Sequence, residues 1–151
     1  MKILLVNPYL TNATYNESSA PLGLLSLISY VREQIPTCKI DLVDLVALSR
    51  GNICQTPRGN RFGPNDAEIR HLVSDLNPDV IGVSCMFTSF ADDSYELTNL
   101  LRKIFPGAFI VMGGAHVSYE ADSVLKNSNA DAVVLKEGEI TFVELLRAIS
   151  S

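Results

Sequence analysis

The fold prediction for this sequence rests mainly on the stretch Phe109-Ile-Val-Met-Gly-Gly-Ala-His-Val-Ser118. Its four leading residues are apolar and include β-branched and aromatic side chains, which is typical of a strand buried on both faces. Gly113 and Gly114 end the run, and glycine allows a sharp turn where another backbone or a flat ligand comes close. A buried parallel strand that ends in two glycines marks the carboxyl edge of an α/β sheet, where such folds bind ligands.

Other apolar runs predict strands of the same kind, and amphipathic segments separate them. The expected strands cover residues 3–6, 40–44, 79–84, 109–112 and 132–135. The expected helices cover residues 21–35, 66–76, 91–105, 119–126 and the segment from about 138 to 149. Crossovers of helical length between buried strands predict an α/β fold with a doubly wound, five-stranded parallel sheet. The flavodoxin-like, Rossmann-like form of this fold has strand order 2-1-3-4-5.

The ends of these helices carry recognisable signals. Pro21 opens the first helix, with Ser19 or Ala20 at the cap. Asp66 is the expected cap of the second helix. The last helix has two candidate starts, one at Gly138 and one at Thr141, where Thr141 and Glu144 have the spacing of a capping box.

Residues 49–65 form the least regular stretch, because glycine and proline recur through it. A loop of this length inside a compact domain is usually either functional or disordered. Its arginines, Arg50, Arg58 and Arg61, are expected to be solvated, and contact with a further domain is the alternative.

Length and composition narrow the classes of protein. The 151 residues, of which 47% are apolar and 19% charged, suit one globular domain spanning residues 1–151. A net charge of −5 without a basic stripe argues against nucleic acid as a partner. No apolar run approaches the roughly 18 residues of a membrane span. Cys38, Cys54 and Cys85 are scattered, which favours a reducing cytoplasm over a disulfide framework.

The ends of the expected strands bring small and hydroxyl-bearing residues to one edge of the sheet. Residues 7–8, 84–89, 113–118 and 137–139 meet there and carry few formal charges. Such an edge suits a large, flat, mostly neutral ligand better than a phosphate-rich one. A dinucleotide site would need G-x-G-x-x-G after the first strand, where the chain has Asn7-Pro8-Tyr9.

Two other classes of domain share this topology, and the sequence lacks the motifs of both. A phospho-receiver domain needs acidic residues after the first and third strands, and Asn7 and Ser84 occupy those places. Lys136, which falls where a receiver lysine would, is therefore interpreted as a coincidence. Flavin mononucleotide binding would need a phosphate loop after the first strand, of which Thr11-Asn12-Ala13-Thr14 is only a faint likeness.

Ser84-x-Met86-x-Thr88, followed by Gly113-Gly114-Ala115, resembles the S-x-L … G-G pattern of cobalamin (vitamin B12) binding domains. The likeness is closer to the amino-terminal domain of B12-dependent radical S-adenosylmethionine enzymes, which include magnesium-protoporphyrin monomethyl ester cyclases and methyltransferases. It covers nearly the whole chain. The motifs that carry it are Pro21-Leu-Gly-Leu-Leu25, Asp79-Val-Ile-Gly-Val-Ser84, Gly113-Gly-Ala-His116 and Glu137-Gly-Glu-x-Thr-Phe142.

The resemblance implies a role for each residue at the strand ends. Ser84 would hydrogen-bond the buried dimethylbenzimidazole tail, while Gly113 and Gly114 would leave room for it. Met86 and Phe87 would pack near the corrin, and the Gly138 turn would line the far side of the cofactor site. The full set expected to bind cobalamin is Asn7, Pro8, Ser84, Met86, Phe87, Thr88, Gly113, Gly114, His116, Glu137 and Gly138.

The sequence departs from the better-known B12 pattern after its first strand. The D-x-H-x-x-G motif, whose histidine ligates cobalt, is missing there, so the resemblance implies base-off cobalamin without a lower histidine ligand. A C-x-x-x-C-x-x-C motif is also missing, so we expect no catalytic residue and no metal ligand in this chain. The resemblance implies a radical domain beyond residue 151, in the same polypeptide, that binds S-adenosylmethionine and a 4Fe–4S cluster.

Each candidate residue also has a simpler interpretation. The Gly113-Gly114 pair suits a ligand-free turn, Ser84 a turn or cap, and His116 a cap or surface group rather than a metal ligand. Cys85 is interpreted as a small buried residue, and acidic residues such as Glu137 favour a helix N-terminus without any chemistry. The alternative function is a cobalamin-free, flavodoxin-like sensing or regulatory domain that acts through protein contacts.

Overall fold

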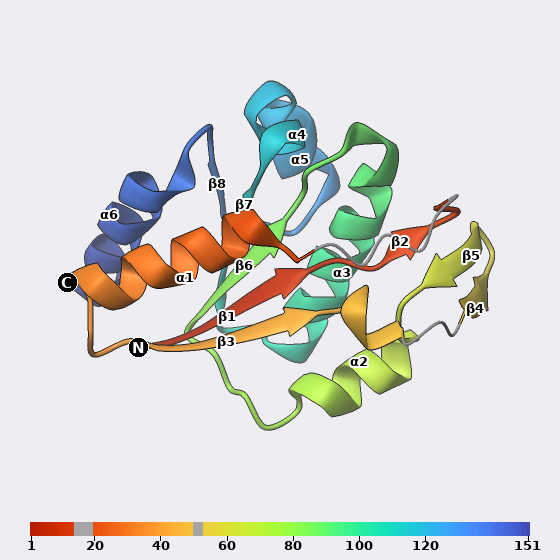
Figure 1. The fold of residues 1–151 in the computed structure, drawn as a ribbon, viewed down its shortest axis with the longest axis horizontal. Helices are drawn as coiled ribbons and strands as arrows, with labels where there is room; N and C mark the ends of the chain where they lie inside the picture. The colour runs from red at the N-terminus through yellow and green to blue at the C-terminus, as the bar shows by residue number, and fades with distance from the viewer. Residues whose placement is uncertain (14–19, 50–52) are drawn as a thin grey trace.

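The computed structural model describes residues 1–13, 20–49 and 53–151. Its main sheet is parallel and has five strands, in the order β3-β1-β6-β7-β8 (Figure 1). The strands are β1 (Lys2–Asn7), β3 (Lys39–Asp44), β6 (Val80–Ser84), β7 (Phe109–Gly113) and β8 (Ala132–Val134). This order confirms the predicted 2-1-3-4-5 arrangement, in which the switch point lies between β1 and β6.

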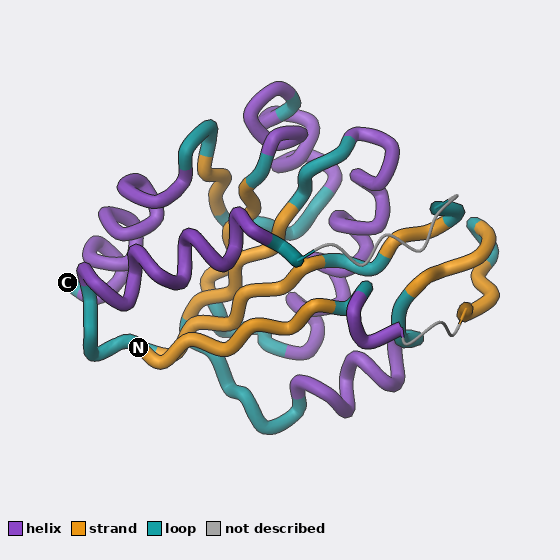
Figure 2. The backbone as a smooth tube through the Cα atoms, viewed as in Figure 1, coloured by secondary structure: helices purple, strands orange, loops and turns teal. Residues whose placement is uncertain are grey.

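Helices cover both faces of this sheet, as the tube in Figure 2 shows. One face carries α1 (Leu22–Gln34) and α6 (Gly138–Ser150), which contact each other. The opposite face carries α2 (Asp66–Val73), α3 (Ala91–Ile104), α4 (Ala115–Tyr119) and α5 (Ala121–Asn127). In the part of the chain that the structure describes, no helix has the length and apolarity that crossing a bilayer requires.

The helices on both faces of the sheet explain why the strand sequences are apolar throughout. In β1, Ile3 and Leu5 belong to the core under α1 and α6, whereas Leu4 and Val6 belong to the core under α2 and α3. Because successive side chains of a strand point to opposite faces, a strand covered on both faces needs an uninterrupted apolar run.

The prediction for residues 49–65 was wrong, because this stretch contains regular structure. A hairpin of β4 (Ile53–Thr56) and β5 (Gly59–Phe62) pairs with β2 (Leu10–Thr11) in a small antiparallel sheet of order β2-β5-β4. This sheet stands beyond the carboxyl ends of β1 and β3 (Figure 1). The 3₁₀ turn Ala47–Ser49 precedes it.

Two arginines of this hairpin are not the free surface groups that we predicted. The side chain of Arg61 is only 8% exposed, lies over the ring of Tyr9 at 3.8 Å, and pairs with Asp66 at 2.7 Å. Arg58 forms ion pairs with Asp93 and Glu96 of α3. Arg50 lies outside the described residues.

The structure also corrects three predicted helix boundaries and decides between the two candidate starts of a fourth helix. The N-cap of α2 is Asn65 rather than Asp66, and it forms a complete capping box with Glu68. Helix α6 begins at Gly138, so the box at Thr141 does not form its start. The single helix expected over 119–126 is two helices, α4 and α5, separated at Glu120. Ala20 is not the cap of α1, which has Pro21 in that position, and Ser19 lies outside the described residues.

Candidate functional site

A row of small and polar residues crosses the carboxyl edge of the sheet. Leu5, Gly82 and Val111 face α1 and α6, so the residues two positions later, Asn7, Ser84 and Gly113, share that face. Ser84 pairs with Gly113, and Asn7 pairs with Asp44 at the end of β3. We call these four residues, Asp44, Asn7, Ser84 and Gly113, the strand-end row.

Only some of the polar groups of the strand-end row form hydrogen bonds to other groups of the protein. Asn7 Nδ2 donates to Asp44 Oδ1 at 3.0 Å, and the same oxygen accepts from the amides of Val46 and Ala47. The second carboxylate oxygen of Asp44 and the hydroxyl of Ser84 make no hydrogen bond to any residue that the structure describes. Sequence reasoning gave Asp44 no role. Its place at the end of the second parallel strand was the available signal.

Gly113, the last residue of β7, and Gly114, which follows it, are glycines for different structural reasons. A Cβ on Gly113 would lie 3.6 Å from the Val134 carbonyl oxygen, which is ordinary contact, so its missing side chain leaves usable space. Gly114 has φ +118°, and a Cβ there would lie 2.5 Å from the Cys85 carbonyl oxygen. Gly113 therefore leaves room along the strand-end row, whereas Gly114 allows two backbones to approach each other.

The space beneath the strand-end row is filled. A Cβ on Gly82 would lie 2.6 Å from Leu5 Cδ2 and 4.0 Å from Phe142 Cζ, and both of these side chains are buried. The open space therefore stops about one side-chain layer below Ser84. Phe142 comes from α6, so the lower limit of the space is set by a helix rather than by the sheet.

Residues that follow β8 flank the far end of the row. A Cβ on Gly138 would lie 3.3 Å from Val134 Cγ1, which places the start of α6 beside the strand that pairs with Gly113. Glu137 precedes it as an exposed N-cap. Glu139 accepts a hydrogen bond at 2.8 Å from Ser26 of α1, which ties the two helices of this face together.

The segment after β6 carries exposed apolar side chains beside the row. Met86 is 49% exposed and Phe87 64% exposed, whereas Cys85 is buried. At the end of β1, Pro8 is buried and does not share this exposure. Apolar surface next to a polar row suits a ligand with both a flat apolar face and hydrogen-bonding groups.

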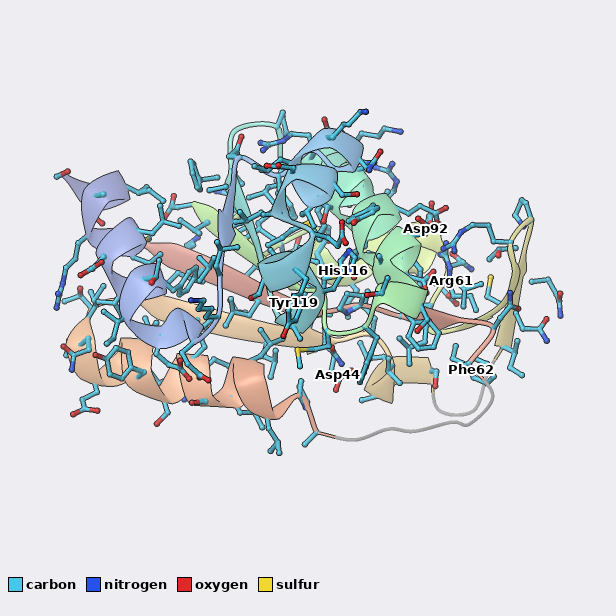
Figure 3. The ribbon with its side chains drawn as sticks, turned by 90° about the horizontal axis from the view of Figure 1, so that it is seen from above. Asp44, Arg61, Phe62, Asp92, His116 and Tyr119 are labelled. Carbon is cyan, nitrogen blue, oxygen red and sulfur yellow. The ribbon has the colours of Figure 1, made fainter. Side chains whose placement is uncertain are left out.

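Thr88 and His116, which we predicted beside the same ligand, meet each other on the opposite face of the sheet. His116 lies near α3, whereas Asp44 lies on the side that faces α1 (Figure 3). His116 is not the cap or surface group of the simpler interpretation, because it is only 5% exposed. Its Nδ1 lies 3.0 Å from Thr88 Oγ1 and its Nε2 lies 2.8 Å from Tyr95 OH. The predicted site residues therefore divide between two faces.

We expect Cys85 to resist alkylation in the folded protein. Burial raises the pKa of its thiol, whereas Cys38 and Cys54 are half-buried. Because the thiolate is the nucleophile, iodoacetamide at about pH 8 should modify Cys85 at least about tenfold more slowly than the other two. Mass spectrometry of timed samples measures the rates, and unfolding in urea should remove the difference. Equal rates in the folded protein would contradict the burial.

Together, the fold and the strand-end row are those of a doubly wound α/β domain, a class of protein that commonly binds its ligands at the carboxyl edge of the sheet. Solved structures with this fold include a cobalamin-binding protein from Desulfitobacterium hafniense, which is 16% identical with a TM-score of 0.62 over 98% of this chain and 58% of that one. They also include the receiver domain of a response regulator from Bacteroides fragilis, 12% identical with a TM-score of 0.57 over 100% and 98% of the two chains. At sequence identities this low, the likeness to these structures establishes the fold alone.

The chain belongs to the B12 binding domain family, whose family model matches residues 10–146. It is 34% identical over 148 residues to a cytidylyl-2-hydroxyethylphosphonate methyltransferase of Streptomyces wedmorensis, covering 94% of this chain and 27% of that protein. It is 32% identical over 155 residues to an uncharacterized methyltransferase of Pyrococcus horikoshii, covering 99% and 30%. The chain thus spans less than a third of the length of these relatives.

Proposed function

We propose that this chain binds cobalamin at the strand-end row, base-off and without a histidine ligand on the lower face. In this proposal it is the amino-terminal module of a cytoplasmic radical S-adenosylmethionine enzyme that transfers a methyl group or closes a ring. Its membership of the B12 binding domain family supports cobalamin as the ligand. The observation that carries the placement is the pairing of Ser84 with Gly113 on the face of α1 and α6.

The chemistry of the row fits the tail of cobalamin. A heteroaromatic nitrogen that leaves water needs a hydrogen-bond donor, and the Ser84 hydroxyl is available for that role. Gly113 leaves space next to it for a planar base. Met86 and Phe87 offer apolar surface to the corrin, and the free oxygen of Asp44 can accept from one of its amide groups.

Among the residues that the structure describes, none near the row is suited to ligate the cobalt from below. The sequence has two histidines, and both nitrogens of His116 are already hydrogen-bonded. His71 is exposed in the last turn of α2. The chain runs from that end of the helix to the start of β6, at the amino edge of the sheet, away from the row. Tyr9 is buried, and burial raises the pKa of its phenol, so it stays neutral. These facts support the proposal of a lower face without a protein ligand.

The proposed chemistry would take place outside this chain. The three cysteines do not form a cluster motif, and within the described residues no group of three or more potential ligands could hold a metal ion. The relatives are more than three times as long and are named methyltransferases. We therefore assign S-adenosylmethionine and the 4Fe–4S cluster to a radical domain of the same polypeptide.

Anaerobic titration with hydroxocobalamin, followed by its visible spectrum, tests the proposed ligand. We expect saturable binding and a base-off spectrum. A base-on spectrum would contradict the proposed coordination, and no binding at high micromolar cobalamin would favour the alternative, a cobalamin-free sensing domain. That alternative draws its support from the likeness to receiver domains, although Asn7 and Ser84 stand where a receiver needs acidic residues.

Replacing Ser84 with leucine tests the position of the tail. The larger side chain removes the hydroxyl and fills the space beside Gly113, so the Kd for cobalamin should rise at least about tenfold. Gly113→Val should have the same effect, since its backbone angles allow a side chain. Ser74→Leu, at the end of α2, is the matched control and should bind normally. Normal binding by both strand-end variants would show that the tail lies elsewhere.

A further inference from the structure

The segment Cys85–Phe90, which we call the 85–90 loop, is held firmly at its first residue. The amide of Cys85 donates to the Gly113 carbonyl at 2.7 Å, and the Cys85 carbonyl accepts from the His116 amide at 3.2 Å. After Cys85 the chain leaves the sheet, and Met86 and Phe87 are exposed. The ring of Phe87 meets that of Phe90 edge-on at 6.5 Å.

Beyond Cys85, one side-chain hydrogen bond links this loop to the rest of the described structure. Within the described residues, the contact between Thr88 Oγ1 and His116 Nδ1 is the only side-chain hydrogen bond made by residues 86–90. The other ring nitrogen of His116 meets Tyr95 OH at 2.8 Å. A neutral imidazole has one donor and one acceptor, and a hydroxyl can serve as either, so both contacts are satisfied in either tautomer.

The groups behind His116 are themselves fixed in place. Tyr95 directly follows the first turn of α3, in which Ser94 donates to the Ser84 carbonyl at 3.2 Å. In the same turn, Asp93 accepts from the amide of Thr11 at 2.7 Å. His116 therefore connects the 85–90 loop, through Thr88, to the start of a helix that is anchored at the end of β6 and at β2.

We propose that His116 is a positioning residue of the cofactor site. It holds Thr88, and through Thr88 it sets how Met86 and Phe87 are presented beside the strand-end row. His116 itself touches no part of that row, because it lies on the opposite face of the sheet. The consequence for the cofactor rests on the proposed function, whereas the effect on the loop does not.

The test compares Thr88→Val with Thr88→Ser. Valine keeps the shape of threonine but cannot bond His116, whereas serine keeps the hydroxyl. In the ligand-free protein, we expect Thr88→Val to speed hydrogen exchange at the Phe90 amide, which is bonded to the Phe87 carbonyl at 3.1 Å, by about tenfold. The Kd for hydroxocobalamin should rise by about the same factor, and Thr88→Ser should restore both values.

Thr98→Val is the matched control for a general loss of stability. Thr98 is a buried threonine of α3 that donates to the Ser94 carbonyl at 2.7 Å, away from the loop. It should leave exchange at Phe90, relative to exchange in β6, unchanged. Unchanged exchange at Phe90 in Thr88→Val would overturn the proposal, as would faster exchange with an unaltered Kd. If the unaltered protein binds no cobalamin, the proposed function fails, and the exchange measurement still decides whether His116 holds the loop.

Discussion

Replacing Gly114 with alanine is expected to lower the free energy of unfolding by about 3 kcal/mol or more. The backbone of Gly114 has φ +118°, a conformation that residues with a side chain rarely adopt. The added Cβ would also lie 2.5 Å from the Cys85 carbonyl oxygen and 2.9 Å from its carbon. These are backbone atoms, so the clash cannot be relieved by rotating a side chain.

Urea denaturation measures this loss, and Gly113→Ala is its control. The two glycines are adjacent, but a Cβ on Gly113 makes only ordinary contacts. We expect Gly113→Ala to change the free energy of unfolding by less than about 1 kcal/mol. Equal losses in the two variants would contradict the separate reasons given for them.

Replacing Asp93 with alanine is expected to lower the free energy of unfolding by about 3 kcal/mol. Asp93 is 1% exposed. Its carboxylate accepts from the amide and the hydroxyl of Thr11, each at 2.7 Å, and pairs with Arg58. Its loss would leave the buried Thr11 groups without partners and would remove one of the two ion pairs that join Arg58 to α3.

Asp92→Ala is the matched control, because Asp92 lies in the same first turn of α3 but is exposed. Both aspartates interact favourably with the N-terminal end of the helix, an effect of about 0.3–1 kcal/mol at an exposed position. The difference between the two variants in thermal or urea denaturation therefore reports the buried contacts of Asp93. A difference below about 1 kcal/mol would show that the hairpin is held mainly by other groups.

The main sheet was predictable because its strands are buried on both faces. Runs such as Ile3–Val6 and Phe109–Met112 are apolar without interruption, and glycine or proline follows them. The order of the strands then follows from the general topology of such sheets. The positions of Asn7, Ser84 and Gly113 at one edge were predictable for the same reason.

The β4–β5 hairpin was not predictable from local sequence. Its strands have only four residues each, and they contain polar residues such as Gln55, Asn60 and Arg61. The third strand of the small sheet, β2, lies more than 40 residues earlier in the chain and has only two residues. Such short strands are stabilised by ion pairs to α2 and α3 and by the contact of Arg61 with Tyr9, which no local pattern reveals.

The division of the candidate residues between two faces was also hidden from the sequence. Within a strand, alternation assigns Ser84 and Gly113 to a common face. Thr88 and His116 lie beyond the strands, in a 3₁₀ turn and in a short helix, where no period of two applies. Their mutual contact depends on how the segment that follows β6 meets the segment that follows β7.

The layer beneath the strand-end row has a kinetic consequence. Leu5 and Phe142 fill the space next to Gly82, so a ligand that extends deeper than Ser84 must displace the Leu5 side chain of β1 and the Phe142 ring of α6. Both side chains belong to the core under α1 and α6, two helices that contact each other, so moving them disturbs that packing. Entry of a long appendage would therefore include an activated step, and its rate would level off at high ligand concentration instead of rising in proportion to it.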